Sequence, residues 1–82
     1  MSISIKVRYF AVFREDKDKE YEFFNIHEPM TLLEFLNRYL GDIVNKIYLI
    51  NIDGKIYPLK EARDILLKKN TEIRLYPPVG GG

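Results

Sequence analysis

The sequence predicts an α+β fold in which one main helix covers one face of a small mixed sheet. Three observations predict it. Apolar and polar residues alternate near both ends of the chain, as they do in half-buried strands. A capped amphipathic helix stands between these segments, and an Asp-Gly pair separates two β-forming runs. The expected element order is therefore β-β-α-β-β, with a short helical piece before the last strand.

Composition limits what the chain can do. Its 82 residues are enough for one domain with a thin core. Thirteen basic and twelve acidic side chains give a formal net charge of +1, so we expect no nucleic-acid partner and no polybasic membrane anchor. We find no apolar run long enough to cross a bilayer and no signal peptide, and we expect a cytoplasmic protein. Cysteine is absent, which excludes disulfides, thiolate metal sites and cysteine nucleophiles.

The first two strands are expected to pair antiparallel, because sequential strands usually lie side by side. The first spans residues 2–10, with Phe10 on its polar face, and its core-facing set is Ile3, Ile5, Val7 and Tyr9. A short helical turn over residues 11–13 and a solvated loop of mixed charge over residues 14–20 should follow. The second strand spans about residues 20–25. His27 is the only histidine, and we expect no metal site.

The main helix is expected at residues 32–40. Thr31 and Glu34 have the spacing of a capping box, in which each side chain bonds the other residue's backbone N–H. Apolar residues then recur at helical spacing, and Gly41 is a natural stop. This apolar stripe is expected to pack on the sheet.

A hairpin follows the helix. Residues 47–52 form a strand, Asp53-Gly54 favours a type I′ turn, and residues 55–57 return up to Pro58. If Tyr48 faces the core, Leu49 faces outward. Residues 61–67 can form one or two helical turns, and the last strand spans residues 71–76.

The open face of the sheet carries a candidate docking patch. With the first and last strands adjacent and parallel, the arrangement is a β-grasp fold. Parity then places Arg8 and Phe10 beside Arg74 and Tyr76, with Leu49 close by if its strand borders the last one. Aromatic residues beside arginine are typical of binding hot spots.

The chain ends in a segment that we expect to be a flexible glycine-rich tail, residues 77–82, following a folded domain of residues 1–76. Pro77 and Pro78 cannot continue a sheet ladder, because they lack the N–H donor. Without side chains, glycines can pass through a narrow channel. The tail comprises Pro77, Pro78, Val79, Gly80, Gly81 and Gly82. A frayed, inert end is the alternative interpretation.

Three segments together resemble the small subunit of molybdopterin synthase, the MoaD branch of the ubiquitin-like sulfur carriers. They are Ile5–Ala11 (IKVRYFA), Thr31–Leu36 (TLLEFL) and the ending Tyr76–Gly82 (YPPVGGG). Two departures stand out: Gly80 replaces the usual Ser or Thr, and residues 69–72 read Lys-Asn-Thr-Glu where the family often has Asp-Gly-Asp-Glu.

The resemblance implies a function for the terminal carboxylate. An E1-like adenylating enzyme would use ATP to activate Gly82, a sulfur donor would displace AMP, and a thiocarboxylate would result. The tail, including Gly80 and Gly81, would enter the large subunit of molybdopterin synthase and give its sulfur to cyclic pyranopterin monophosphate. The patch of Phe10, Leu49 and Tyr76 would dock there. The carrier itself would bind no cofactor and no metal.

Three other functions stay open. A ubiquitin-like protein modifier would use the same activated Gly82 to form an isopeptide bond with a lysine. A sulfur carrier for thiamine synthesis or tRNA thiolation would use the same thiocarboxylate, although the Pro77-Pro78 step favours the molybdopterin branch. The last alternative is an interaction module with an inert tail.

Overall fold

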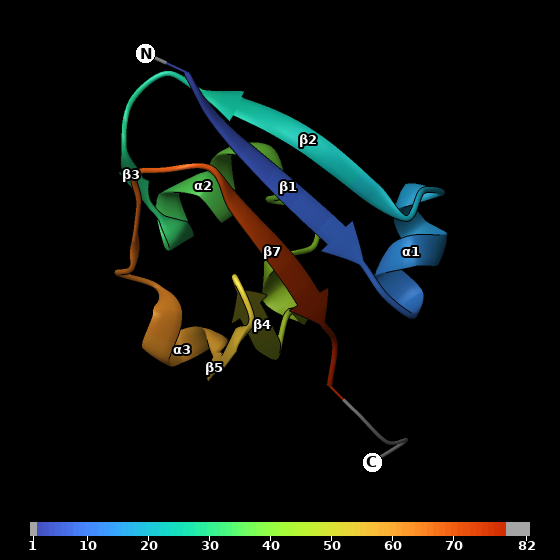
Figure 1. Cartoon of the computed structure of the whole chain (residues 1–82). Coiled ribbons are helices and arrows are strands. Elements are labelled where there is room, and N and C mark those ends of the chain that lie inside the picture. The colour runs from blue at the N-terminus through green and yellow to red at the C-terminus, as the bar shows by residue number, and fades with distance from the viewer. Residues whose placement is uncertain (1, 79–82) are drawn as a thin grey trace.

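The computed structural model describes residues 2–78, and in it α2 lies across one face of a five-stranded mixed sheet (Figure 1). The elements in chain order are β1 (Ile3–Tyr9), α1 (Val12–Lys17), β2 (Tyr21–Ile26), β3 (Met30–Thr31), α2 (Leu32–Tyr39), the 3-10 turn η1 (Val44–Lys46), β4 (Leu49–Ile52), β5 (Lys55–Pro58), α3 (Leu59–Ala62), β6 (Leu66–Leu67) and β7 (Thr71–Tyr76). The strand order is β2-β1-β7-β4-β5. The first and last strands, β1 and β7, are adjacent and parallel, and the other pairs are antiparallel. The predicted β-grasp topology is therefore confirmed.

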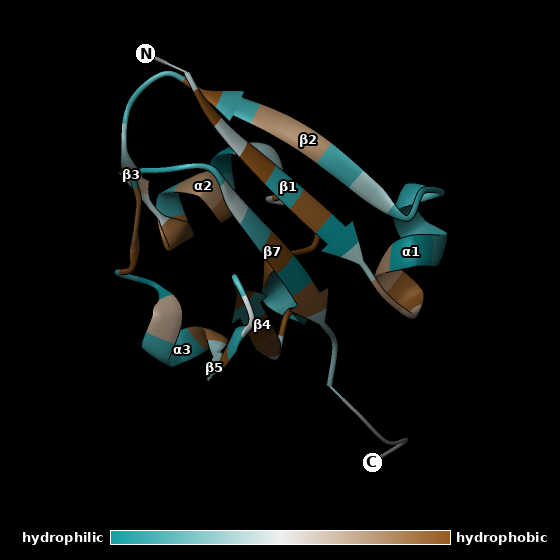
Figure 2. Cartoon of the chain, viewed as in Figure 1, coloured by the Kyte–Doolittle hydropathy of each residue, from teal (hydrophilic) through white to brown (hydrophobic). Residues whose placement is uncertain are grey.

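The core lies between the sheet and α2. Alternate residues of β1 and β7 are buried, as the period of a strand with one covered face requires. Figure 2 shows this alternation as hydrophobic and hydrophilic bands along both strands. All four residues predicted to face the core from the first strand are buried, and so are Ile73 and Leu75 of β7.

The predicted capping box fixes the start of α2. The Thr31 hydroxyl accepts the Glu34 N–H at 3.2 Å, and the Glu34 carboxylate accepts the Thr31 N–H at the same distance. The helix ends at Tyr39, one residue earlier than predicted, and the Leu40 N–H still donates to the Leu36 carbonyl.

The Asp-Gly turn is also confirmed. Asp53 and Gly54 have φ values of 50° and 94°, both positive, as a type I′ turn demands. The return strand is one residue longer than predicted, because Pro58 belongs to it and pairs with Leu49.

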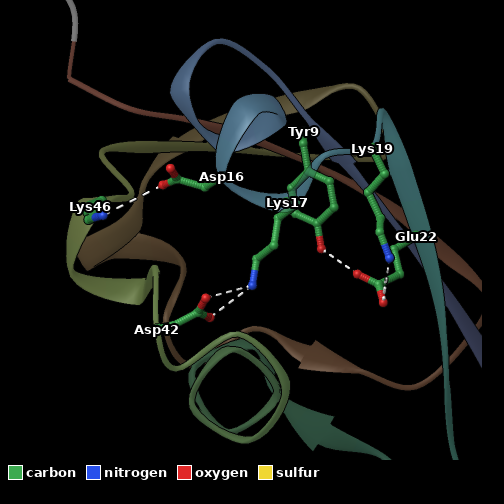
Figure 3. A network of polar contacts seen from close by, with 7 residues as sticks. All are labelled: Tyr9, Asp16, Lys17, Lys19, Glu22, Asp42 and Lys46. Carbon is green, nitrogen blue, oxygen red and sulfur yellow. Dashed lines mark hydrogen bonds and ion pairs between the residues drawn. The ribbon is translucent and has the colours of Figure 1, made fainter.

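The charged run after β1 was wrongly predicted as a loop in its first half. Residues 14–17 continue α1, because Phe13 anchors this short helix in the core and leaves residues 14–16 exposed, with Lys17 half-buried. Lys17 donates to the Asp42 carboxylate at 2.7 Å, which lowers the Asp42 pKa, and Lys46 lies 3.6 Å from Asp16. These ion pairs link α1 to Asp42, in the loop after α2, and to Lys46, at the end of η1 (Figure 3).

Tyr48 was wrongly assigned to the core. It is 56% exposed, whereas Ile47 is buried. The reason is that β4 begins only at Leu49 and η1 precedes it, so strand parity does not extend back to residues 47 and 48.

The segment before β7 also differs from the prediction. Its helix, α3, begins and ends earlier than residues 61–67, and Leu67 instead belongs to the two-residue strand β6. Leu67 pairs with Met30 of β3, a contact between distant parts of the sequence that no local pattern encodes.

Residues 2–78 contain neither a helix suited to cross a membrane nor a cluster of metal-ligating side chains. No helix there is long and apolar enough to cross a bilayer. Across the same residues, no group of three or more His, Asp or Glu side chains is placed to hold a metal ion, and His27 is exposed.

Candidate functional site

The candidate site is built at the end of β7, where the chain leaves the sheet. Tyr76 is the last residue of that strand and lies opposite Leu49 of β4. The Tyr76 carbonyl accepts the Tyr48 N–H at 2.9 Å, so the main chain is held to the sheet up to this residue. Pro77 is half-buried and Pro78 exposed, and neither belongs to a strand or helix.

Phe10 and Tyr76 form an aromatic stack at this point. Their ring centroids are 5.2 Å apart and the rings are tilted by only 10°. The contact follows from the parallel pairing of β1 with β7. Because Tyr9 is level with Leu75, Phe10 comes level with Tyr76 one step later.

A sharp turn fixes Phe10 at the end of β1. Ala11 has φ 52° and ψ −129°, a conformation that glycine adopts more readily than alanine. The turn lets the Phe10 carbonyl accept the Phe13 N–H at 3.1 Å at the start of α1. Phe10 is thus held between β1 and α1 rather than on a free loop.

The two predicted arginines lie two residues back along the same strands, on the same face of the sheet. Arg8 is level with Arg74, and both lie near Glu72. Arg74 donates to Glu72 at 3.0 Å, and this hydrogen bond lowers the pKa of the Glu72 carboxyl and raises that of the Arg74 guanidinium. Lys6 also lies 3.8 Å from Glu72, so one carboxylate serves three cations. The open face of β1 and β7 below the aromatic stack therefore carries a net positive charge, from three cations and one carboxylate.

The structure brings together five of the residues predicted for the site, namely Arg8, Phe10, Leu49, Arg74 and Tyr76. Pro77 and Pro78 follow directly after this group, and the rest of the predicted tail, Val79, Gly80, Gly81 and Gly82, lies outside the described residues. The docking and transfer roles of all these residues stay predictions.

Sequence reasoning missed two features near the site. Glu72 organises the cations, and its parity in β7, shared with Arg74 and Tyr76, could have revealed it. The Tyr9 hydroxyl, buried in the core, donates to Glu22 at 2.9 Å (Figure 3). Burial and this carboxylate together raise the pKa of Tyr9. Nothing in the spacing of these two residues distinguishes the bond from ordinary strand alternation.

The family profile that matches this sequence covers residues 7–82 and is described as the ThiS family. The chain belongs to the ThiS family. Ubiquitin-like sulfur carriers and modifiers of the ThiS and MoaD type make up this family, and its members work with larger subunits and E1-like enzymes.

Solved structures of other proteins share the fold of this ThiS-family chain. The Haloferax volcanii HVO 2177 protein is 17% identical with a TM-score of 0.70, and the match covers 99% of this chain and 88% of that one. The small archaeal modifier protein 1 (SAMP1) from Methanosarcina acetivorans is 23% identical with a TM-score of 0.68, over 100% and 99% of the two chains.

A third similar structure comes from Pyrococcus furiosus and is described as a "Putative molybdopterin converting factor, subunit 1". It is 22% identical with a TM-score of 0.67, and the match covers 94% of this chain and 99% of that one. At these identities the three structures establish the fold alone. No curated protein matches the sequence.

Proposed function

We propose that this ThiS-family protein is a sulfur carrier for molybdopterin synthesis. An E1-like enzyme adenylates the Gly82 carboxylate, a sulfur donor converts it to a thiocarboxylate, and the large subunit of molybdopterin synthase receives the loaded tail. Membership of the family supports the carrier chemistry. The Tyr76-Pro77-Pro78 step supports the choice of the molybdopterin branch.

The observation that carries the proposal is the stack of Phe10 on Tyr76, beside Leu49, at the last residue of β7. Aromatic and arginine side chains are enriched where protein surfaces bind. A partner that docks on this patch holds the root of residues 77–82, which span about 20 Å when extended. Docking then makes sulfur delivery nearly intramolecular, which favours the reaction by reducing its entropic cost.

The chemistry of the terminus balances without any side chain of this protein. A Gly82 carboxylate oxygen attacks the α-phosphorus of ATP and pyrophosphate leaves. The sulfur donor then displaces AMP, and a C–S bond replaces the C–O bond. When the thiocarboxylate sulfur has bonded to the pterin precursor, water hydrolyses the acyl–sulfur bond, so the sulfur stays on the pterin and the Gly82 carboxylate is restored. The chain has no cysteine, so the terminus is the sulfur-bearing group in this scheme.

Protein modification is the second candidate function. The similar fold of the protein named small archaeal modifier protein 1 motivates it. The activated Gly82 is the same, but a lysine amine attacks it and an isopeptide bond forms. Thiamine synthesis and tRNA thiolation would share the thiocarboxylate and differ in the acceptor.

Reconstitution separates these functions. The protein is incubated with its E1-like partner, ATP and sulfide, and then with the large subunit and cyclic pyranopterin monophosphate. We expect the dithiolene product by mass spectrometry, and none from a matched chain that lacks Gly82. A loaded protein that yields no dithiolene but forms isopeptide bonds with lysines would overturn the molybdopterin assignment in favour of the modifier.

A further inference from the structure

The outer edge of the sheet at β2 offers unpaired backbone groups. In an antiparallel pair, residues alternate between those that bond the neighbouring strand and those that point away from it. The Tyr9 N–H donates to the Glu20 carbonyl at 2.8 Å, and β1 and β2 continue in this register through the pair of Val7 with Glu22. The N–H and C=O groups of Tyr21, Phe23 and Asn25 therefore point away from β1, toward the open edge.

This edge has no proline and no lysine within the strand, and its one charged residue, Glu22, is paired with Tyr9 and Lys19. Proline and lysine commonly block unwanted pairing at sheet edges. The opposite edge, β5, has both, in Lys55 and Pro58. The sequence of β2, YEFFNI, has neither. Of the two edges of the sheet, β2 is therefore the one whose composition opposes pairing with another strand less.

Aromatic side chains flank the β2 edge on both faces of the sheet. On the open face, Tyr21 and Phe23 are 45% and 59% exposed and meet edge to face at 5.8 Å. On the helix face, half-buried Phe24 lies 5.3 Å from the half-buried ring of Tyr39. A strand added to β2 would therefore lay its alternate side chains against aromatic surface on both sides.

The open face beside this edge is positively charged. The Lys6 ammonium lies 4.6 Å from the centroid of the Tyr21 ring and 5.6 Å from that of Phe23, and the Arg8 guanidinium lies 5.7 Å from the Tyr21 ring. Glu72 is the carboxylate that both cations approach, and it also binds Arg74. An incoming strand with acidic side chains on this face would supply the missing negative charge.

We propose that the β2 edge binds an extended acidic segment of a partner protein, which pairs with the backbone of Tyr21, Phe23 and Asn25 as an additional strand. Its acidic side chains lie on the open face toward Lys6 and Arg8, and its apolar side chains lie beside Phe24 and Tyr39. The β2 backbone is distinct from the end of β7, although Arg8 borders both sites, and the tail chemistry does not depend on the β2 edge.

A designed peptide tests the proposal. The probe is Ac-Val-Asp-Val-Asp-Val-Asp-Val-NH2, and its matched control has Lys at each Asp position. Titration into the isotopically labelled full chain should shift the amide resonances of residues 21, 23 and 25 in a saturable way. The lysine peptide should bind about tenfold more weakly, because like charges then face each other. Equal binding of both peptides, or shifts confined to other parts of the sheet, would overturn the proposal.

Two variants sharpen the test. Phe23→Pro removes an outward N–H and no bond to β1, so the protein should stay folded and lose peptide binding. Lys6→Glu keeps every backbone donor, and it should weaken the Asp peptide about tenfold while favouring the Lys peptide. If Lys6→Glu still preferred the Asp peptide over the Lys peptide to the same extent as the wild type, the charge argument would be refuted. If the protein formed a dimer through β2 in the absence of peptide, the occupant of this edge would be a second copy of the chain. That result would refute the proposal that an acidic partner segment binds there.

Discussion

Replacing Phe10 with alanine should weaken partner binding more than folding. In the free protein, Phe10 is half-buried and stacks on Tyr76 at 5.2 Å. Such a stack adds about 0.5–1.5 kcal/mol beyond area burial. Truncating a fully buried Phe costs about 3–5 kcal/mol, so we expect about 1–2 kcal/mol for this half-buried ring. That loss corresponds to a fall in Tm of roughly 5–15 °C for a domain of this size.

The loss of affinity should be larger. A central aromatic residue of an interface costs about 2–4 kcal/mol when it is truncated, or roughly 30-fold or more in Kd. Isothermal titration calorimetry with the molybdopterin synthase large subunit measures this cost, and urea denaturation measures the loss of stability. Tyr76→Ala and the double variant complete a cycle in the free protein, in which we expect a coupling of about 0.5–1.5 kcal/mol.

The matched control is Ile56→Ala, which removes an exposed apolar side chain from β5. Its affinity should stay within about threefold of the wild type, since surface substitutions away from an interface have small effects. An unchanged Kd in both Phe10→Ala and Tyr76→Ala would remove the docking patch from the account. The docking patch would also be excluded if Phe10→Ala and Tyr76→Ala lost no more affinity than the control Ile56→Ala.

Three further predictions concern the tail and the fold. Deleting Gly82, or adding one residue after it, should abolish sulfur transfer and leave the Tm unchanged, because the buried core identified in residues 2–78 ends at Leu75; a large fall in Tm on deletion would contradict this. Thr31→Ala should cost about 1 kcal/mol in urea denaturation at neutral pH, whereas Thr31→Ser should restore most of it. Hydrogen bonds that Thr31 donates lower the pKa of the Glu34 carboxyl. The stability that these bonds provide is therefore present at neutral pH and should be lost as the pH falls through the lowered pKa. If Thr31→Ala lowered the free energy of unfolding equally at pH 7 and well below that pKa, this prediction would be refuted. Tyr9→Phe should cost about 1–2 kcal/mol, because it leaves Glu22 without its buried donor; stability equal to the wild type would show that water replaces the bond freely.

The sequence predicts those parts of the fold that local chemistry determines. The capping box at Thr31 and the positive φ values of the Asp53-Gly54 turn need only neighbouring residues, and both are found. Parity is reliable where a strand is continuous, as in β1 and β7. It fails at Tyr48, because the 3-10 turn before β4 breaks the alternation. The short β3–β6 pair depends on a contact between distant segments, which no local pattern reports.

The same distinction applies to the candidate site. The grouping of Phe10 with Tyr76 follows from two strands whose parity and adjacency were both predictable. The flat stacking and the sharp turn at Ala11 depend on side-chain packing and on how α1 leaves the sheet. The role of Glu72 as the shared partner of three cations requires distances that the sequence does not give.

The central claim is that sulfur is carried on the terminal carboxyl group. Intact-mass spectrometry of the chain purified from its native host during active cofactor synthesis tests this most directly. We predict a population whose mass corresponds to one oxygen replaced by sulfur, with fragment ions that place the change at Gly82. A chain found only with an unmodified terminus under those conditions, or joined through Gly82 to lysines and never thiocarboxylated, would contradict the account.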